Sequence, residues 1–151
     1  MGVSILVEWP GSTEDEQGGH PGFENDDHLW ATWVVTVIED PKVAADLRKI
    51  GCEVLLRHNT SNLDPNEIGW GSPREFESAA LKLRKLVDAK DPAVQTLLDT
   101  YRVEWGRLIG EDEDEERGAE QWFAQDLQDV AAIAKYAGAC GAKKMTLAYY
   151  W

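Results

Sequence analysis

Residues 72–108 read SPREFESAALKLRKLVDAKDPAVQTLLDTYRVEWGRL, and this stretch predicts two successive helices. The first begins at Ser72-Pro73-Arg74-Glu75, a capping box in which the serine hydroxyl and the glutamate carboxylate accept backbone N–H groups at the start of the helix. The second begins where Asp91 caps Pro92. Apolar residues recur every three or four positions in both helices, at Phe76, Ala80, Leu83 and Val87 and then at Val94, Leu97, Leu98, Tyr101, Trp105 and Leu108. Because the connection is short, we expect an antiparallel helical hairpin.

Two further helices are predicted on either side of this pair. Asp40 and Pro41 supply an N-cap and a first helical residue, and Gly51 supplies the end of that helix. Residues 119–137 repeat the helical spacing of apolar residues, and Gly138 is the predicted stop. A single helical turn is expected at residues 64–67.

Four segments predict strands. Residues 3–9 and 143–151 alternate in the period of a half-buried strand. Residues 29–38 also fit a helical face, but their β-branched side chains favour a strand. Residues 52–58 have a continuous apolar centre, typical of a strand buried on both faces, and a parallel crossover with the preceding strand is expected. The order β-β-α-β-α-α-α-β predicts an α+β fold, a single domain over residues 1–151 with a mixed sheet of about four strands packed by three to four helices.

The composition fits one folded domain. The chain has 151 residues, of which 43% are hydrophobic and 28% are charged, which is ordinary for globular proteins and unlike disordered ones. Cys52 and Cys140 are isolated in the sequence, so we expect reduced thiols rather than a disulfide or a structural zinc site. No signal-peptide pattern begins the sequence, and no apolar run reaches the roughly 20 residues that span a bilayer. A cytoplasmic, bacterial location is therefore expected.

The net charge of −13 comes from two short segments. Nine acidic residues precede the first basic residue, Lys42, and six more run without interruption from Glu111 to Glu116. The sequence thus predicts acidic loops at residues 10–28 and 110–118 on a body that is close to neutral. This charge repels phosphate backbones and anionic lipid headgroups, so it argues against nucleic acids and membranes as partners. Basic proteins and divalent cations remain.

Carboxylates in these loops are suitable ligands for hard divalent cations. The run at 111–116 does not match an EF-hand loop, because Arg117 stands at the sixth position from Asp112, where glycine is required. His20, Asp26 and His28 are candidate ligands for a first-row metal, although the histidine spacing is longer than that of the usual ligand pairs. A solvated loop explains the same residues without a metal.

Nucleophilic catalysis and nucleotide binding have little support in the sequence. His58 follows a predicted strand, where α/β sites often form, but a residue at this position more often caps the strand or meets solvent. No nucleophile elbow and no phosphate-binding glycine motif is present. The bases Lys82, Arg84 and Lys85 are predicted to form a solvated helix face, paired in part with acids of the same helix.

The predicted function is a small acidic cytoplasmic protein-binding module, one form of which is an inhibitor or immunity-type protein that neutralises a basic partner. Acidic loops would steer the partner and aromatic side chains would anchor it. The expected partner-binding residues are Glu14, Asp15, Glu16, Asp26, Asp27, Trp70, Trp105, Glu111, Asp112, Glu113, Asp114, Glu115 and Glu116. Two alternatives stay open, a divalent-metal-binding protein or metal-dependent enzyme that uses the carboxylates and histidines, and a non-catalytic structural subunit. A binding role is favoured over a catalytic one, no cofactor is expected apart from a divalent cation, and a homodimer is compatible with the sequence.

Overall fold

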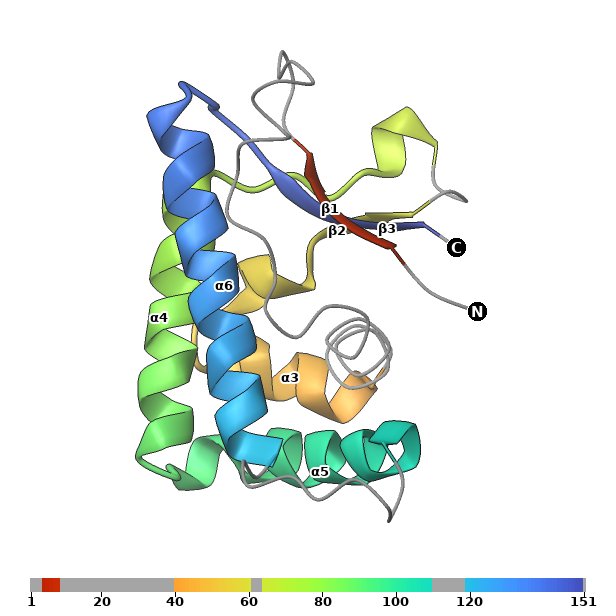
Figure 1. Cartoon of the computed structure of the whole chain (residues 1–151), viewed down its shortest axis with the longest axis vertical. Coiled ribbons are helices and arrows are strands. Elements are labelled where there is room, and N and C mark those ends of the chain that lie inside the picture. The colour runs from red at the N-terminus through yellow and green to blue at the C-terminus, as the bar shows by residue number, and fades with distance from the viewer. Residues whose placement is uncertain (1–3, 9–39, 61–63, 110–118, 151) are drawn as a thin grey trace.

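The computed structural model describes residues 4–8, 40–60, 64–109 and 119–150 (Figure 1). Most of these residues belong to four α-helices: α3 (Pro41–Lys49), α4 (Pro73–Asp88), α5 (Gln95–Ile109) and α6 (Ala119–Ala139). Three short strands are present, β1 (Ser4–Glu8), β2 (His58–Thr60) and β3 (Thr146–Tyr150). Short 3₁₀ helices occupy the connections, η2 (Glu53–Leu56), η3 (Pro65–Glu67) and η4 (Pro92–Val94).

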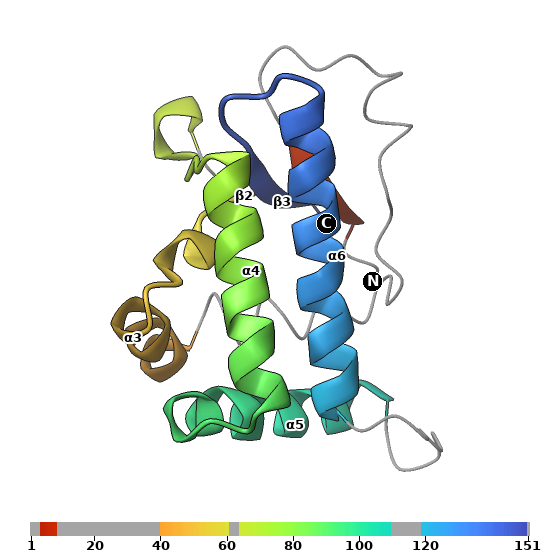
Figure 2. The same cartoon turned by 90° about the vertical axis from the view of Figure 1, so that its left-hand side faces the viewer.

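Helices α4 and α6 lie side by side and antiparallel, as both views show (Figures 1 and 2). The start of α4 meets the end of α6, where a Cβ on Gly138 would lie 3.6 Å from the Cβ of Pro73. Further along, Arg84 Nη1 of α4 donates a hydrogen bond to Gln128 Oε1 of α6. The buried faces carry small residues beside large ones, at Phe76, Ala79, Ala80 and Leu83 of α4 and at Phe123, Leu127, Ala131, Ala134 and Ala137 of α6. The alanines allow the two backbones to approach closely, so this pair forms the centre of the core.

Helix α5 crosses beneath the ends of α4 and α6 instead of running along α4 (Figures 1 and 2). The predicted antiparallel hairpin of residues 73–88 with 91–108 is therefore wrong, because the antiparallel neighbour of α4 is α6. The chain turns at Lys90, whose φ of 51° lies in the left-handed region, and then enters η4, where Asp91 accepts a hydrogen bond from the backbone N–H of Ala93. This turn and the 3₁₀ helix together redirect the chain before α5 begins.

The sheet is small, and its order is β1-β3-β2. Strand β3 is central, antiparallel to β1 with Ser4 opposite Tyr150, and parallel to β2 with His58 opposite Leu147. An isolated bridge joins Gly71 to Met145, each residue donating its N–H to the carbonyl of the other. This bridge holds the start of α4 against the start of β3.

The predicted α+β fold, with a mixed sheet of about four strands packed by three to four helices, is wrong: the described residues are mostly helical, and they contribute only three short strands, at one end of the helices (Figure 1). The predicted strand at 52–58 is η2 followed by β2. Val54 and Leu55 are buried in η2, and a short buried apolar run looks the same in sequence whether it is a strand or a 3₁₀ turn. The predicted strand at 29–38 lies outside the described residues.

The predicted N-terminal caps of the helices, by contrast, are confirmed. Asp40 Oδ1 accepts the N–H groups of Lys42 and Val43 at 2.9 and 3.2 Å, and Ser72 forms the predicted capping box with Glu75. The helical turn at 64–67 and the strands within 3–9 and 143–151 are also present. The end of α6 differs, since Gly138 is helical and the left-handed residue that closes the helix is Gly141.

A buried polar contact ties α5 to α6. Tyr101 is fully buried, its hydroxyl donates to Asp126 Oδ2 at 2.8 Å, and its ring packs edge-on against Phe123 with centroids 4.5 Å apart. Asp126 is itself fully buried. Burial, together with the negative charge of Asp126 and the hydrogen bond to it, raises the pKa of Tyr101 well above its usual value. Among the described residues, no helix combines the length and the hydropathy that crossing a bilayer requires.

Alanine substitutions at two glycines should change the free energy of unfolding in opposite directions. At Gly71 a Cβ would lie 2.5 Å from Val54 Cγ2 and 2.9 Å from Phe76 Cε2, so Gly71→Ala should lower the free energy of unfolding by about 1–3 kcal/mol through overpacking. At Gly138 the added methyl makes an ordinary contact, so Gly138→Ala should raise it by about 0.5–1 kcal/mol because alanine favours the helix. Urea unfolding of both variants measures the difference. Equal effects at the two positions would contradict the packing at Gly71.

Replacing Tyr101 with Phe should lower the free energy of unfolding at pH 7 by about 1.5–3 kcal/mol, because Asp126 loses a buried hydrogen bond. The pKa of Tyr101 is higher in the folded protein than in the unfolded chain, where it is about 10. The stabilisation from Tyr101 is therefore complete below about pH 10 and is lost as the pH rises further. The difference between the wild type and Tyr101→Phe should therefore narrow above about pH 10. Urea titrations at neutral and alkaline pH test both statements, and a constant difference would refute the second.

Candidate functional site

Most residues that the sequence nominates for a site lie outside the described residues. This holds for the acidic loops at 10–28 and 110–118, and so for Glu14, Asp15, Glu16, Asp26, Asp27 and Glu111 to Glu116. It holds equally for the metal candidates His20, Asp26 and His28. These assignments stay predictions. In the described ranges, no group of three or more His, Cys, Asp and Glu side chains is placed to hold a metal ion.

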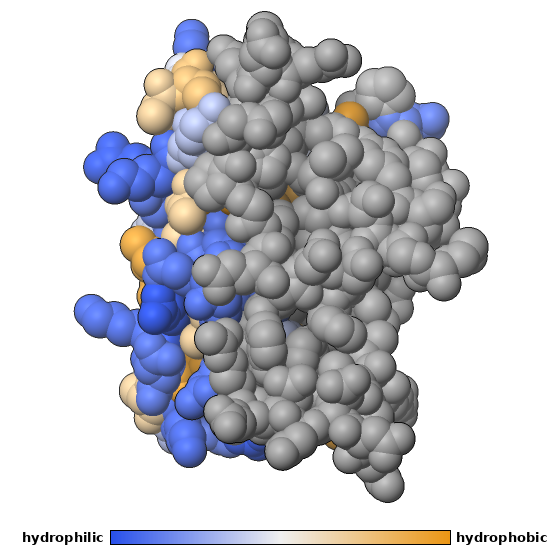
Figure 3. Space-filling model, in the orientation of Figure 1, coloured by the Kyte–Doolittle hydropathy of each residue, from blue (hydrophilic) through white to orange (hydrophobic). Residues whose placement is uncertain are grey.

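The folded body itself is nearly neutral. The described ranges hold fifteen acidic and fourteen basic residues, a net charge of −1, whereas the whole chain carries −13. A net charge of −12 therefore belongs to segments outside the helices and strands described above. On the part of the surface that Figure 3 colours, hydrophilic residues are interspersed with hydrophobic ones.

Of the two predicted aromatic anchors, Trp70 is the one whose side chain is described. It is partly exposed, and Lys144 Nζ lies 5.0 Å from its ring centroid, within the range of a cation–π interaction. The backbone carbonyl of Trp70 accepts a hydrogen bond of 2.6 Å from Arg57 Nη1. Trp70 thus lies among cations, an environment that attracts acidic groups. Trp105 lies in α5, and its side chain is outside the described set.

A hollow of about 590 Å³ lies between α4 and the segment formed by the end of α3 and η2, which face each other in Figure 2. Four basic side chains line it, those of Arg48, Arg57, Arg74 and Lys82. Two acidic side chains, Glu53 and Glu75, line it as well. We call this hollow the cationic cleft.

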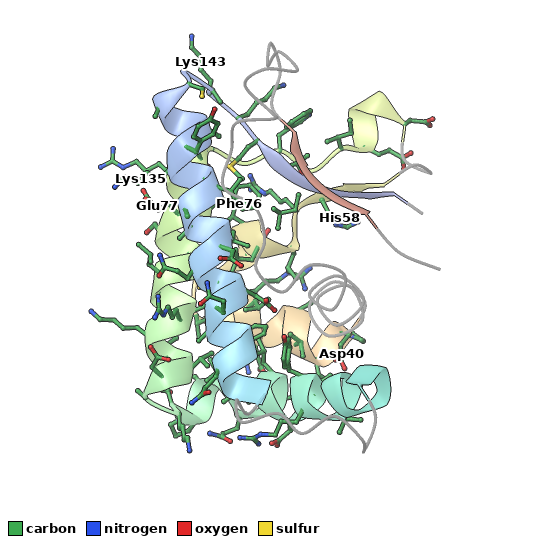
Figure 4. The ribbon with its side chains drawn as sticks, in the orientation of Figure 1. Asp40, His58, Phe76, Glu77, Lys135 and Lys143 are labelled. Carbon is green, nitrogen blue, oxygen red and sulfur yellow. The ribbon has the colours of Figure 1, made fainter. Side chains whose placement is uncertain are left out.

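The cationic cleft follows from the local structure of its two walls. On α4, Arg74, Ser78 and Lys82 recur every four residues and so share one face, which is exposed while Phe76 points into the core (Figure 4). On the other wall, α3 is followed by Gly51, whose φ of 78° suits a residue without Cβ. The N–H of Gly51 bonds to the carbonyl of Arg48 there, and the chain turns directly into η2.

Lys82 reaches across the cationic cleft. Its Nζ lies 3.3 Å from the position that a Cβ on Gly51 would take, so the missing side chain leaves room for the ammonium group. Beneath it, Cys52 is fully buried, and its Sγ lies 3.6 Å from the carbonyl of Ala79. Burial raises the pKa of the Cys52 thiol, and the charge of Lys82 offsets only part of that rise. Cys52 is therefore a structural thiol rather than a nucleophile.

The sequence interpretation missed the cationic cleft. It placed Lys82, Arg84 and Lys85 on a solvated face paired in part with acids of the same helix, and the 3.7 Å ion pair of Arg84 with Asp88 confirms that pairing. It did not predict that Lys82 also lines a cleft. The four-residue spacing of Arg74, Ser78 and Lys82 was the available signal for one wall, but nothing in the sequence brings Arg48 and Arg57 to face it.

His58 lies at the start of β2, an edge strand of the sheet (Figure 4). Its Nδ1 lies 2.8 Å from the carbonyl of Leu56, and since a carbonyl can only accept, Nδ1 carries the proton. This contact fixes the ring against the backbone of η2.

Comparisons with protein-family models, with curated proteins and with solved structures give no match to this chain.

Proposed function

We propose that this protein is a small acidic cytoplasmic protein-binding module that neutralises a basic partner, in the manner of an inhibitor or immunity-type protein. The observation that supports this proposal is the separation of charge. A net charge of −12 lies outside a described body whose own net charge is −1.

The negative charge of the two acidic loops is suited to attracting a basic protein. Long-range attraction raises the rate of encounter by 10-fold to 1,000-fold, on the order of what electrostatically steered pairs gain, and salt weakens it. The near-neutral body can fold without internal repulsion, because its acids and bases are mixed. The proposed steering residues are those of the two acidic loops.

Anchoring would come from aromatic side chains, which dominate the energy of many interfaces. Trp70 is partly exposed, although Lys144 lies over its ring, so a basic partner would have to displace or avoid that lysine. Trp105 is the second proposed anchor. In this scheme the acidic loops set the association rate, and the tryptophans set the lifetime of the complex.

The partner can be isolated on the tagged protein from a lysate of the native organism, washed at low and then at high salt, and identified by mass spectrometry. A stoichiometric basic protein that salt releases is the expected result. Absence of any such protein at either salt concentration would remove the support for this function.

Association kinetics with that partner then test the acidic run directly. A variant with Glu111, Glu113 and Glu115 replaced by Ser should associate about tenfold more slowly at low salt, with a weaker salt dependence, because the steering field is reduced. The matched control removes three charges from the described body, with Asp46→Asn, Glu53→Gln and Glu77→Gln, and should associate nearly as fast as the wild type. If the two variants behave alike, net charge alone matters and the acidic run is not the steering surface.

A further inference from the structure

The cationic cleft concentrates positive charge on a protein that is otherwise strongly acidic. Its four bases, Arg48, Arg57, Arg74 and Lys82, come from α3, from the residue after η2 and from α4. The ion pairs found in the described part of the chain are Arg84–Asp88 and Arg102–Asp99, and neither includes a base of the cleft. Four cations thus share one hollow without a salt bridge to an acid of the described body.

The two acids of the cleft, Glu53 and Glu75, do not neutralise its four bases. The Glu75 carboxylate accepts the backbone N–H of Ser72 at 3.2 Å as part of the capping box that starts α4. Glu53 is exposed at the start of η2. Two acids against four bases leave the lining with a net positive charge, so an anion that enters the cleft gains from the surrounding field.

Part of the cleft is already held in place. Arg57 is fixed by its 2.6 Å bond to the Trp70 carbonyl, and the rigid helix α4 sets the spacing of Arg74, Ser78 and Lys82. Groups that are held before binding lose less conformational freedom when a ligand arrives. Ser72 and Ser78 also line the cleft, together with the apolar residues Val54 and Ala79.

The size and chemistry of the lining define the class of ligand. A volume of about 590 Å³ falls within the range of roughly 300–1,000 Å³ that is typical of small-molecule sites. Guanidinium groups present forked N–H donors that match phosphate oxygens, and a lysine adds a compact point charge. Such a site would be built from side chains, since the chain has no phosphate-binding glycine motif.

We propose that the cationic cleft binds a small ligand through a phosphate group, with Arg57, Arg74 and Lys82 as its principal binding residues. This site uses none of the residues proposed in the acidic loops and does not rest on the protein-binding function. It would bring a phosphorylated small molecule to the face of α4 opposite its core side.

Inorganic pyrophosphate is the probe for this proposal, titrated by calorimetry at constant ionic strength. The wild type should bind it saturably, and Arg74→Gln and Lys82→Gln should each weaken binding by about tenfold, because each removes a charge-assisted hydrogen-bond donor. Both side chains are exposed, so the substitutions should leave the fold intact, which circular dichroism checks.

Lys135→Gln is the matched control, since this lysine is exposed on α6 and points away from the body (Figure 4). It removes one positive charge and should leave pyrophosphate binding unchanged. Sulfate at equal ionic strength should bind much more weakly than pyrophosphate. The proposal is overturned by an absence of saturable binding to the wild type, by equal losses in Lys82→Gln and Lys135→Gln, or by equal affinity for sulfate.

Discussion

Close packing of α4 against α6 is the constraint on which the other elements depend. It requires small side chains at buried positions of both helices, such as Ala80 and Ala134, and it leaves no room for a bulky residue there. With α4 fixed, one of its faces is committed to the core and another is free to form a wall of the cationic cleft. The end of α6 leads through Gly141 to β3, so the same pair of helices also determines where the sheet begins.

The sequence was sufficient for features that depend on neighbouring residues. Asp40, Ser72 and Asp91 cap the elements that follow them as expected, because a cap needs only the next three N–H groups. The sequence was not sufficient where contacts between distant segments determine the structure. The short connection after α4 suggested a hairpin, but the left-handed turn at Lys90 and the 3₁₀ helix η4 give α5 another direction. The apolar run at Val54 likewise fits either a strand or the 3₁₀ helix that is present.

The distinction between local and long-range features also explains which parts of the candidate function could be predicted. Acidic runs are continuous in the sequence, so composition alone identifies them and suggests a basic partner. The cationic cleft is discontinuous, because Arg48 and Arg57 face Arg74 and Lys82 only after α3, η2 and α4 have packed. The protein therefore combines two fields of opposite sign, one visible in the chain and one created by folding.

The order of strands in the sheet has a consequence for how the protein forms during its synthesis. The central strand, β3, follows both of its neighbours in the sequence, and β1 and β2 do not pair with each other. A ribosome therefore delivers both outer strands, and all the described helices, before the strand that joins them exists. Among the described strands β1 pairs with β3 alone, and the pairing of Ser4 with Tyr150 closes a long loop. The helices can assemble first, whereas the sheet is the last part of this fold to become possible.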